Sequence, residues 1–270
     1  MPPLRRPAGL AKPRRSGAAA NQDIVWLFDL DNTLHDCSHH IFQVIDSTMS
    51  KVMMDWLKLD RPEADRLRLN YWVRYGATAI GLEEHHGINA DAFLEASHDF
   101  DVSPLVHAER GIANKLAQLP GRKILLTNAP ERYARDVLKS LGILHHFELL
   151  WSINHMRLQG RIRCKPSVAM LRQLLARLRV PAHQVVLVDD TMANLRSARA
   201  VGMRTVLSHH PSTPHNARHY GRDLYIDLRL NRVGELLSRR HRELATGRQA
   251  GASIPSKQGR GRSASSATAW

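Results

Sequence analysis

The stretch of sequence that decides the fold is "VWLFDLDNTL", residues 25–34. Four apolar residues in succession are typical of a strand that helices cover on both faces of a parallel sheet. The run stops at Asp29 and Asp31, with Thr33 two positions further on. Because ligands of open parallel sheets bind beyond the carboxyl ends of the strands, these side chains are candidates for a functional site.

Short apolar runs and helical patterns alternate along the rest of the chain. Strands are predicted at residues 24–28, 123–127, 148–152, 185–188 and 204–207, and helices at about 131–141, 168–178 and 192–202. This alternation indicates βαβ units. We therefore predict an α/β fold with a Rossmann-like parallel sheet at its core.

The alternation is interrupted once, after the first strand. Roughly 95 residues separate the first strand from the second, far more than the dozen or so that a crossover connection needs. Apolar residues recur at helical spacing from Ile41 to Trp56, and further helical patterns cover about 62–75, 90–98 and 105–118. We predict an inserted α-helical cap domain at residues 38–117, between two parts of the core at 22–37 and 118–230.

The net charge of +14 is concentrated at the two ends of the chain. Residues 1–21 and 244–270 contain nine of the basic residues and no acidic residue. Both segments are poor in large apolar side chains, which predicts disordered basic tails. Such tails can hold nucleic acid weakly and without sequence preference, through phosphate contacts. A nucleic-acid-associated binding protein is therefore the alternative from a different functional class.

Several classes of protein are disfavoured by composition. No run approaches the roughly 18 apolar residues of a membrane span, and residues 1–20 lack the apolar segment of a secretory signal. We expect a cytoplasmic protein with no membrane partner. Cysteine phosphatases need an arginine six positions after the nucleophile, but Gln43 and Met170 stand there after Cys37 and Cys164. That mechanism is excluded.

Polar side chains also follow two other predicted strands. The second strand ends at Thr127 and Asn128, and the strand at 185–188 is followed by Asp189 and Asp190. Together with the first strand, these ends bring four carboxylates to one edge of the sheet. Carboxylates gathered without a counter-charge repel one another, so a cation is expected among them. Oxygen ligands favour Mg²⁺, and Lys165 in "RCKPS" is the candidate second cation.

The motifs occur in the order "FDLDNT", "LLTN", "KPS" and "VVLVDD", and the last is followed by Asn194. In this order they resemble the four motifs of the haloacid dehalogenase superfamily of phosphohydrolases, over about residues 24–208. The segments "YWVRYGATAIGL" and "LPGRKILLTNAPERYARDVLKSLGI" are similar to the pyrimidine 5′-nucleotidase subfamily.

The resemblance implies a role for each motif residue. Asp29 would be the nucleophile that becomes an aspartyl-phosphate. Asp31 would protonate the leaving group and then activate water, while its backbone carbonyl helps to hold the metal. Thr127 would bind a phosphoryl oxygen, and Lys165 would neutralise charge on Asp29 and the phosphoryl group. Arg161 or Arg163 is an alternative that could share or replace the role of Lys165.

The resemblance also implies the metal and substrate contacts. Mg²⁺ would be held by Asp29, Asp31, Asp189 and Asp190. Thr33 and Asn128 are further candidates for phosphate binding, with Thr33 and Asn194 as supporting residues. In the cap, the candidate substrate contacts are His39, His40, Tyr71, Trp72, Arg74 and Tyr75. The alternative for these aromatic residues is that they form the core of the cap.

The predicted function is a Mg²⁺-dependent phosphomonoester hydrolase of small molecules, most simply a pyrimidine 5′-nucleotidase acting on UMP or CMP. A phosphoglycolate phosphatase or a sugar-phosphate phosphatase is the alternative within the same superfamily. The sequence does not indicate the oligomeric state.

Overall fold

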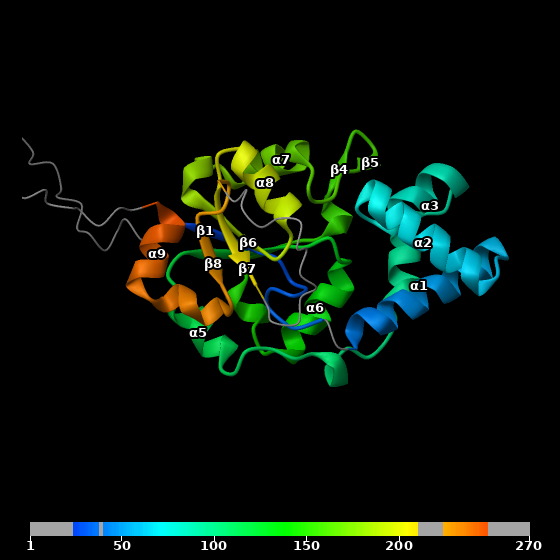
Figure 1. The fold of residues 1–270 in the computed structure, drawn as a ribbon, viewed down its shortest axis with the longest axis horizontal. Coiled ribbons are helices and arrows are strands. Elements are labelled where there is room, and N and C mark those ends of the chain that lie inside the picture. Colours follow the sequence, from blue (N-terminus) through cyan, green and yellow to red (C-terminus); the bar gives the residue numbers. More distant parts are fainter. Residues whose placement is uncertain (1–23, 38–39, 210–223, 248–270) are drawn as a thin grey trace, which may run out of the picture.

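A computed structural model describes residues 24–37, 40–209 and 224–247 (Figure 1). The fold is α/β, as predicted. Its six-stranded sheet is parallel throughout and has the strand order β3-β2-β1-β6-β7-β8. The strands are β1 (Val25–Phe28), β2 (Arg122–Leu126), β3 (Leu149–Trp151), β6 (Val185–Asp189), β7 (Arg204–Ser208) and β8 (Leu228–Leu230).

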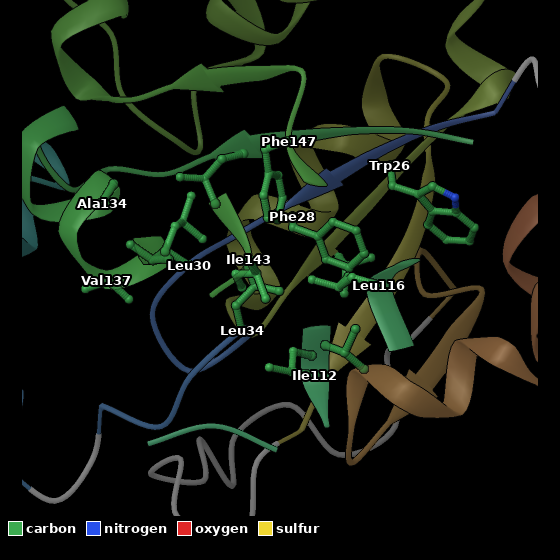
Figure 2. Close-up of a cluster of buried hydrophobic side chains, with 14 of the residues drawn as sticks. Trp26, Phe28, Leu30, Leu34, Ile112, Leu116, Ala134, Val137, Ile143 and Phe147 are labelled. Atoms are coloured by element: carbon green, nitrogen blue, oxygen red, sulfur yellow. The ribbon is translucent and has the colours of Figure 1, made fainter. Parts of the chain in front are cut away.

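The central strand β1 supplies side chains to both faces of the sheet. Trp26 and Phe28 are fully buried in one apolar cluster (Figure 2), and Val25 and Leu27 are fully buried in the other. Helices cover both faces, so the sheet forms the middle layer. On the first face lie α5 (Ile112–Gln118), α6 (Glu131–Ser140) and α9 (Arg239–Thr246); on the second lie α7 (Val168–Leu178) and α8 (Met192–Ala200).

A helical insert lies between β1 and β2, beside the sheet (Figure 1). It contains α1 (Ile41–Leu57), α2 (Arg61–Tyr75), α3 (Thr78–His86) and α4 (Ala90–Ser97), and we call these four helices the cap. Asp60 begins α2 by accepting a hydrogen bond from the Glu63 amide, with Pro62 in the first turn, and the left-handed Gly76 ends it. The exact domain limits at residues 38 and 117 stay a prediction.

The structure differs from the sequence prediction at residues 105–118. A 3₁₀ turn covers Ser103–Leu105, and α5 begins only at Ile112. The reason is local: Gly111 has a φ of 72°, in the left-handed region, which a continuous right-handed helix does not pass through. Ile112 and Leu116 then pack into the cluster that contains Phe28. This last helix before β2 therefore belongs with the sheet rather than with the cap helices.

Outside the cap, three further features were not predicted. Strands β4 (Arg157–Leu158) and β5 (Arg161–Ile162) form an antiparallel hairpin, and β8 extends the sheet at one edge. The third is α9, which runs to Thr246 and thus includes residues 244–246, expected in the C-terminal tail. Residues 1–23 and 248–270, which contain the rest of the predicted tails, lie outside the described residues. No helix in the described part of the chain is long and apolar enough to cross a membrane.

Candidate active site

Asp29 follows β1 in the middle of the sheet. Phe28 is paired in register with Leu125 of β2 and with Val188 of β6. The Asp29 amide donates a hydrogen bond to the Val188 carbonyl over 2.9 Å, and its carboxylate Oδ1 accepts one from the Leu30 amide over 2.8 Å. The sheet therefore holds this nearly buried carboxylate in one orientation at its carboxyl edge.

Lys165 joins Asp29 to Asp189. Its Nζ lies 2.7 Å from Asp29 Oδ1 and 2.7 Å from Asp189 Oδ2, and its side chain is 3% exposed. Burial alone would lower the pKa of Lys165, but the charges of Asp189 and Asp29 outweigh burial and raise that pKa. The lysine is therefore a permanent cation at neutral pH. The structure brings together three side chains that lie far apart in the sequence.

The loop that carries Lys165 is fixed by Asn128, the residue two positions beyond β2. Asn128 Oδ1 accepts a hydrogen bond from the Lys165 amide over 2.9 Å, and Asn128 Nδ2 donates one to the Lys165 carbonyl over 3.0 Å. Two residues on, the Ser167 side chain caps α7 by accepting a hydrogen bond from the Met170 amide. The sequence suggested phosphate binding for Asn128 but not this contact with the lysine loop.

Asp189 is completely buried at the end of β6. Its Oδ1 accepts hydrogen bonds from the Thr191 amide over 2.8 Å and from Asn194 Nδ2 over 2.9 Å, and its Oδ2 also accepts from Asn194 over 3.1 Å. With the bond from Lys165, both oxygens of this carboxylate have partners. Asn194 thus holds Asp189 in place, in agreement with a supporting role.

Asp29, Asp189 and Asp190 form a cluster of carboxylates whose ligand oxygens all lie within 4.8 Å of one another. Burial, followed by the charge of Asp189, raises the pKa of Asp190 to about 7. Burial also raises the pKa of Asp29, and Asp189 and Asp190 add to this effect against the opposing charge of Lys165. Carboxylate oxygens this close together are the kind of donor that a hard divalent cation such as Mg²⁺ prefers.

Asp31 has different surroundings. Its Oδ1 accepts hydrogen bonds from the Tyr133 hydroxyl over 2.9 Å and from Cys37 Sγ over 3.1 Å, and it lies 3.0 Å from His35 Nε2. Burial would raise the pKa of Asp31, but the bonds from His35, Cys37 and Tyr133 outweigh it and lower the pKa. None of these three partners was predicted from the sequence. Tyr133 lies 102 residues from Asp31, so no local pattern could have found it.

The other predicted site residues differ in burial and in hydrogen bonding. Thr127 is buried, and its Oγ1 accepts a hydrogen bond from the Ala129 amide over 3.0 Å. Thr33 is also buried, and its hydroxyl has no partner among the described residues. Such an unpaired hydroxyl is available to a bound ligand or water. His39 lies outside the described residues.

Tyr75 lies where the cap approaches the lysine loop. Its carbonyl accepts a hydrogen bond from Cys164 Sγ, and a Cβ on the neighbouring Gly76 would stand 3.3 Å from the Lys165 carbonyl. The hydroxyl of Tyr75, however, is bonded to His85 Nε2 within the cap. The backbone at the end of α2 thus borders the site, while the tyrosine side chain packs against its own domain.

The β4–β5 hairpin also contacts the cap. Arg157 donates to Glu83 of α3 over 3.0 Å and to Asp91 of α4 over 3.3 Å. Two arginines remained as alternatives to Lys165 in the sequence: Arg161 in β5 and Arg163 just after it, and both are exposed. Lys165 is the residue that makes ion pairs with Asp29 and Asp189.

A cavity of about 320 Å³ lies between α4 and α6. Acidic side chains from both helices line it, together with Arg132, and Tyr133 reaches it from α6; the acidic residues are Asp91, Glu95 and Glu131. Its lining does not include Asp29, Asp189 or Lys165. The cavity is therefore separate from the carboxylate cluster around Lys165.

The chain thus combines a Rossmann-like parallel sheet, a helical insert after the first strand, and a lysine between carboxylates at the carboxyl edge of the sheet. Residues 26–208 match the family model described as haloacid dehalogenase-like hydrolase. The chain belongs to this family.

Relatives of this chain include phosphatases. "Phosphate metabolism protein 8" of Saccharomyces cerevisiae is 27% identical over 68% of this chain, and the match covers 60% of that protein. A phosphoglycolate phosphatase of Pseudomonas syringae pv. tomato is 26% identical over 67% of each chain. Among solved structures, the HAD-hydrolase YfnB of Bacillus subtilis, bound to magnesium, covers 80% of this chain and 97% of its own, with a TM-score of 0.51 and 12% identity. That likeness shows the shared fold.

Proposed function

We propose that this protein is a Mg²⁺-dependent phosphomonoester hydrolase that works through an aspartyl-phosphate on Asp29. One observation carries the proposal: the buried ammonium group of Lys165 bridges Asp29 and Asp189, with the oxygens of Asp190 inside the same 4.8 Å cluster. A buried cation beside a nucleophilic carboxylate favours an anionic substrate, because it offsets the repulsion between the two.

In the first step, Asp29 attacks phosphorus. Its Oδ1 is already bonded to the Leu30 amide and to Lys165, which leaves Oδ2 to form the new bond. As the bond from phosphorus to the ester oxygen breaks, Asp31 gives a proton to the departing alkoxide. Thr127 and Lys165 hold phosphoryl oxygens while the charge moves.

In the second step, the aspartyl-phosphate is hydrolysed. Asp31, now ionised, takes a proton from a water molecule, and the resulting hydroxide attacks phosphorus and releases Asp29 and inorganic phosphate. The lowered pKa of Asp31 favours this ionised state. An approaching phosphate dianion acts in the opposite direction and helps Asp31 to carry a proton in the first step.

The donor set at the carboxyl edge fits Mg²⁺, because it consists of carboxylate oxygens from Asp29, Asp189 and Asp190. The backbone carbonyl of Asp31 is the further ligand implied by the family resemblance. When bound, the ion would offset the repulsion between the anionic nucleophile and the anionic substrate. The magnesium bound to YfnB supports this choice.

The substrate class is a small soluble phosphomonoester. The named relatives favour a phosphorylated acid such as phosphoglycolate over a nucleotide. The second candidate is a pyrimidine nucleotide such as UMP or CMP. It is supported by the cap segment at residues 71–82, whose Tyr75 and Gly76 border the lysine loop.

The test is a panel of phosphoglycolate, sugar phosphates, UMP and CMP, assayed for phosphate release with Mg²⁺ and with EDTA. We expect Asp29→Asn to lose essentially all activity, since no covalent intermediate can form. The control is Asp136→Asn on the surface of α6, which should match the wild type. An inactive wild type, or an active Asp29→Asn variant, would disprove the proposal. The order of kcat/KM across the panel decides between the two substrate candidates.

A further inference from the structure

The hydrogen bonds on Asp31 all converge on one of its two oxygens. Tyr133, Cys37 and His35 each lie 2.9 to 3.1 Å from Oδ1. A carboxylate oxygen has two lone pairs in its plane, so three neighbours saturate it. Among the described residues, no hydrogen-bond partner of Oδ2 is found.

These neighbours are themselves rigidly held. His35 and Cys37 are buried in the loop that follows β1, where the Cys37 amide donates to Asn32 Oδ1 over 3.0 Å. Tyr133 comes from α6 on another part of the chain and is 1% exposed. Its ring packs edge-on against His98, with 5.3 Å between ring centroids, and lies 6.3 Å from Phe100. Both of these residues lie just beyond α4, where the chain leaves the cap.

We propose that Tyr133, assisted by His35 and Cys37, is a positioning residue that fixes Asp31 through Oδ1, so that Oδ2 is the oxygen that transfers the proton to and from the reacting groups. This inference rests on the proposed function, in which Asp31 is the general acid and base. Without these donors the carboxylate would rotate among orientations, and only some would place a proton on the leaving oxygen. Asp31 follows Asp29 by two residues in the same loop, and Asp29 belongs to the carboxylate cluster.

The inference predicts an effect that depends on the leaving group. A phosphomonoester with an alkoxide leaving group needs protonation by Asp31, whereas p-nitrophenyl phosphate leaves as a stabilised phenolate and needs little help. For Tyr133→Phe we expect kcat/KM to fall about 10-fold to 100-fold on the best alkyl ester of the panel and less than about 3-fold on p-nitrophenyl phosphate. Asp31→Asn, which removes the proposed acid itself, should give the largest difference between the losses of kcat/KM on the two substrates.

Matched variants distinguish a positioning role of Tyr133 from a general loss of stability or activity. Tyr225→Phe removes the hydroxyl of another partly buried tyrosine, which lies just before the edge strand β8, and should leave the ratio of the two activities unchanged. Cys37→Ser and His35→Gln keep a donor and should retain the wild-type ratio better than Cys37→Ala and His35→Ala. Unfolding in urea measures any loss of stability separately.

Three outcomes would overturn the inference: Tyr133→Phe lowers both activities by the same factor, it lowers neither, or Tyr225→Phe changes the ratio equally. A wild type that hydrolyses no ester would instead refute the proposed function, and the inference with it. Failure of the inference and failure of the proposed function are therefore distinguishable, because the three outcomes that overturn the inference require an active wild type.

Discussion

Asp29 and Asp31 lie two residues apart in one loop, yet their surroundings push their pKa values in opposite directions. Burial and two neighbouring carboxylates raise the pKa of Asp29 in spite of Lys165. Burial acts on Asp31 as well, but the three groups on its Oδ1 outweigh it and lower the pKa. Hydrogen bonds and the neighbouring His35 therefore outweigh burial at Asp31, whereas the charge of Lys165 does not outweigh burial and the neighbouring carboxylates at Asp29.

The difference fits two kinds of chemistry. Asp29 belongs to a cluster of close carboxylates in which burial and the neighbouring charges raise its pKa in spite of Lys165. Asp31 Oδ1 has three hydrogen-bonding neighbours from the chain itself, whereas Oδ2 has no partner among the described residues. The first surroundings suit a nucleophile that shares a metal, and the second suit a group that exchanges a proton. Substitutions at Lys165, Asp190 and Asn128 test whether the charged cluster depends on its cation.

The largest expected effect follows from removing the lysine. Lys165→Met leaves Asp29 and Asp189 buried without their counter-charge, which typically costs about 3–5 kcal/mol of unfolding free energy. Activity should fall at least about 100-fold, because a fixed charge at the transition state is lost. Urea unfolding and phosphate release measure the two effects. Lys139→Met, an exposed lysine of α6, is the control, and equal effects of the two substitutions would contradict the comparison.

The second effect is a pH dependence of the metal-free protein. The pKa of Asp190 is about 7 in the folded protein, above its ordinary value of 3.8, so the folded state binds a proton more tightly than the unfolded state. The stabilisation from this proton is complete at low pH and is lost as the pH rises through 7. Asp29 shifts in the same direction. The lowered pKa of Asp31 acts only at more acidic pH.

In EDTA, the unfolding free energy should therefore fall between pH 5.5 and pH 8, and Mg²⁺ should restore more stability at pH 8 than at pH 5.5. Asp190→Asn should reduce the pH dependence, and the surface substitution Asp136→Asn should leave it unchanged. Urea unfolding at both pH values checks this. A wild type that is more stable at pH 8 in EDTA would show that the carboxylate cluster does not control this pH range.

The charged cluster was predictable from the sequence, and the surroundings of Asp31 were not. Consecutive apolar residues in "VWLF" and "VVLV" mark buried strands, and the aspartates that follow must meet at one sheet edge. Tyr133 sits at a buried position of an amphipathic helix, where the pattern indicates only core packing. Its contact with Asp31 depends on how α6 docks on the sheet. That geometry follows from tertiary packing, which periodicity does not encode.

The same limit explains the elements that were missed. Strand β8 is only three residues long and has the exposed Arg229 at its centre, so it lacks the continuous apolar run of the inner strands. The β4–β5 hairpin has two residues in each strand around Gly160. Both are too short for hydrophobic periodicity to reveal them.

A smaller effect is expected at Asn128, which holds the lysine loop from β2. Asn128→Ala removes both hydrogen bonds to the Lys165 backbone and should cost about 1–3 kcal/mol of unfolding free energy, because a buried donor and acceptor lose their partners. We expect a drop in kcat of about 10-fold, since a displaced lysine stabilises charge less well. Asn114→Ala on the exposed surface of α5 is the control. An unchanged kcat would mean that Lys165 keeps its position without the two hydrogen bonds from Asn128.

The smallest effect is expected at Arg157. Like Lys165, it forms ion pairs with two carboxylates, but these pairs are in contact with solvent. Its side chain and that of Glu83 are each 31% exposed, and Asp91 is 46% exposed. Water screens these ion pairs, so Arg157→Ala should lower the unfolding free energy by less than about 1 kcal/mol, and 1 M salt should reduce the difference further. Thermal unfolding at low and high salt measures it. If Arg157→Ala lost as much unfolding free energy as Lys165→Met, burial would not explain the difference between the ion pairs of Lys165 and those of Arg157. The contacts of the hairpin with α3 and α4 would then contribute substantially to stability.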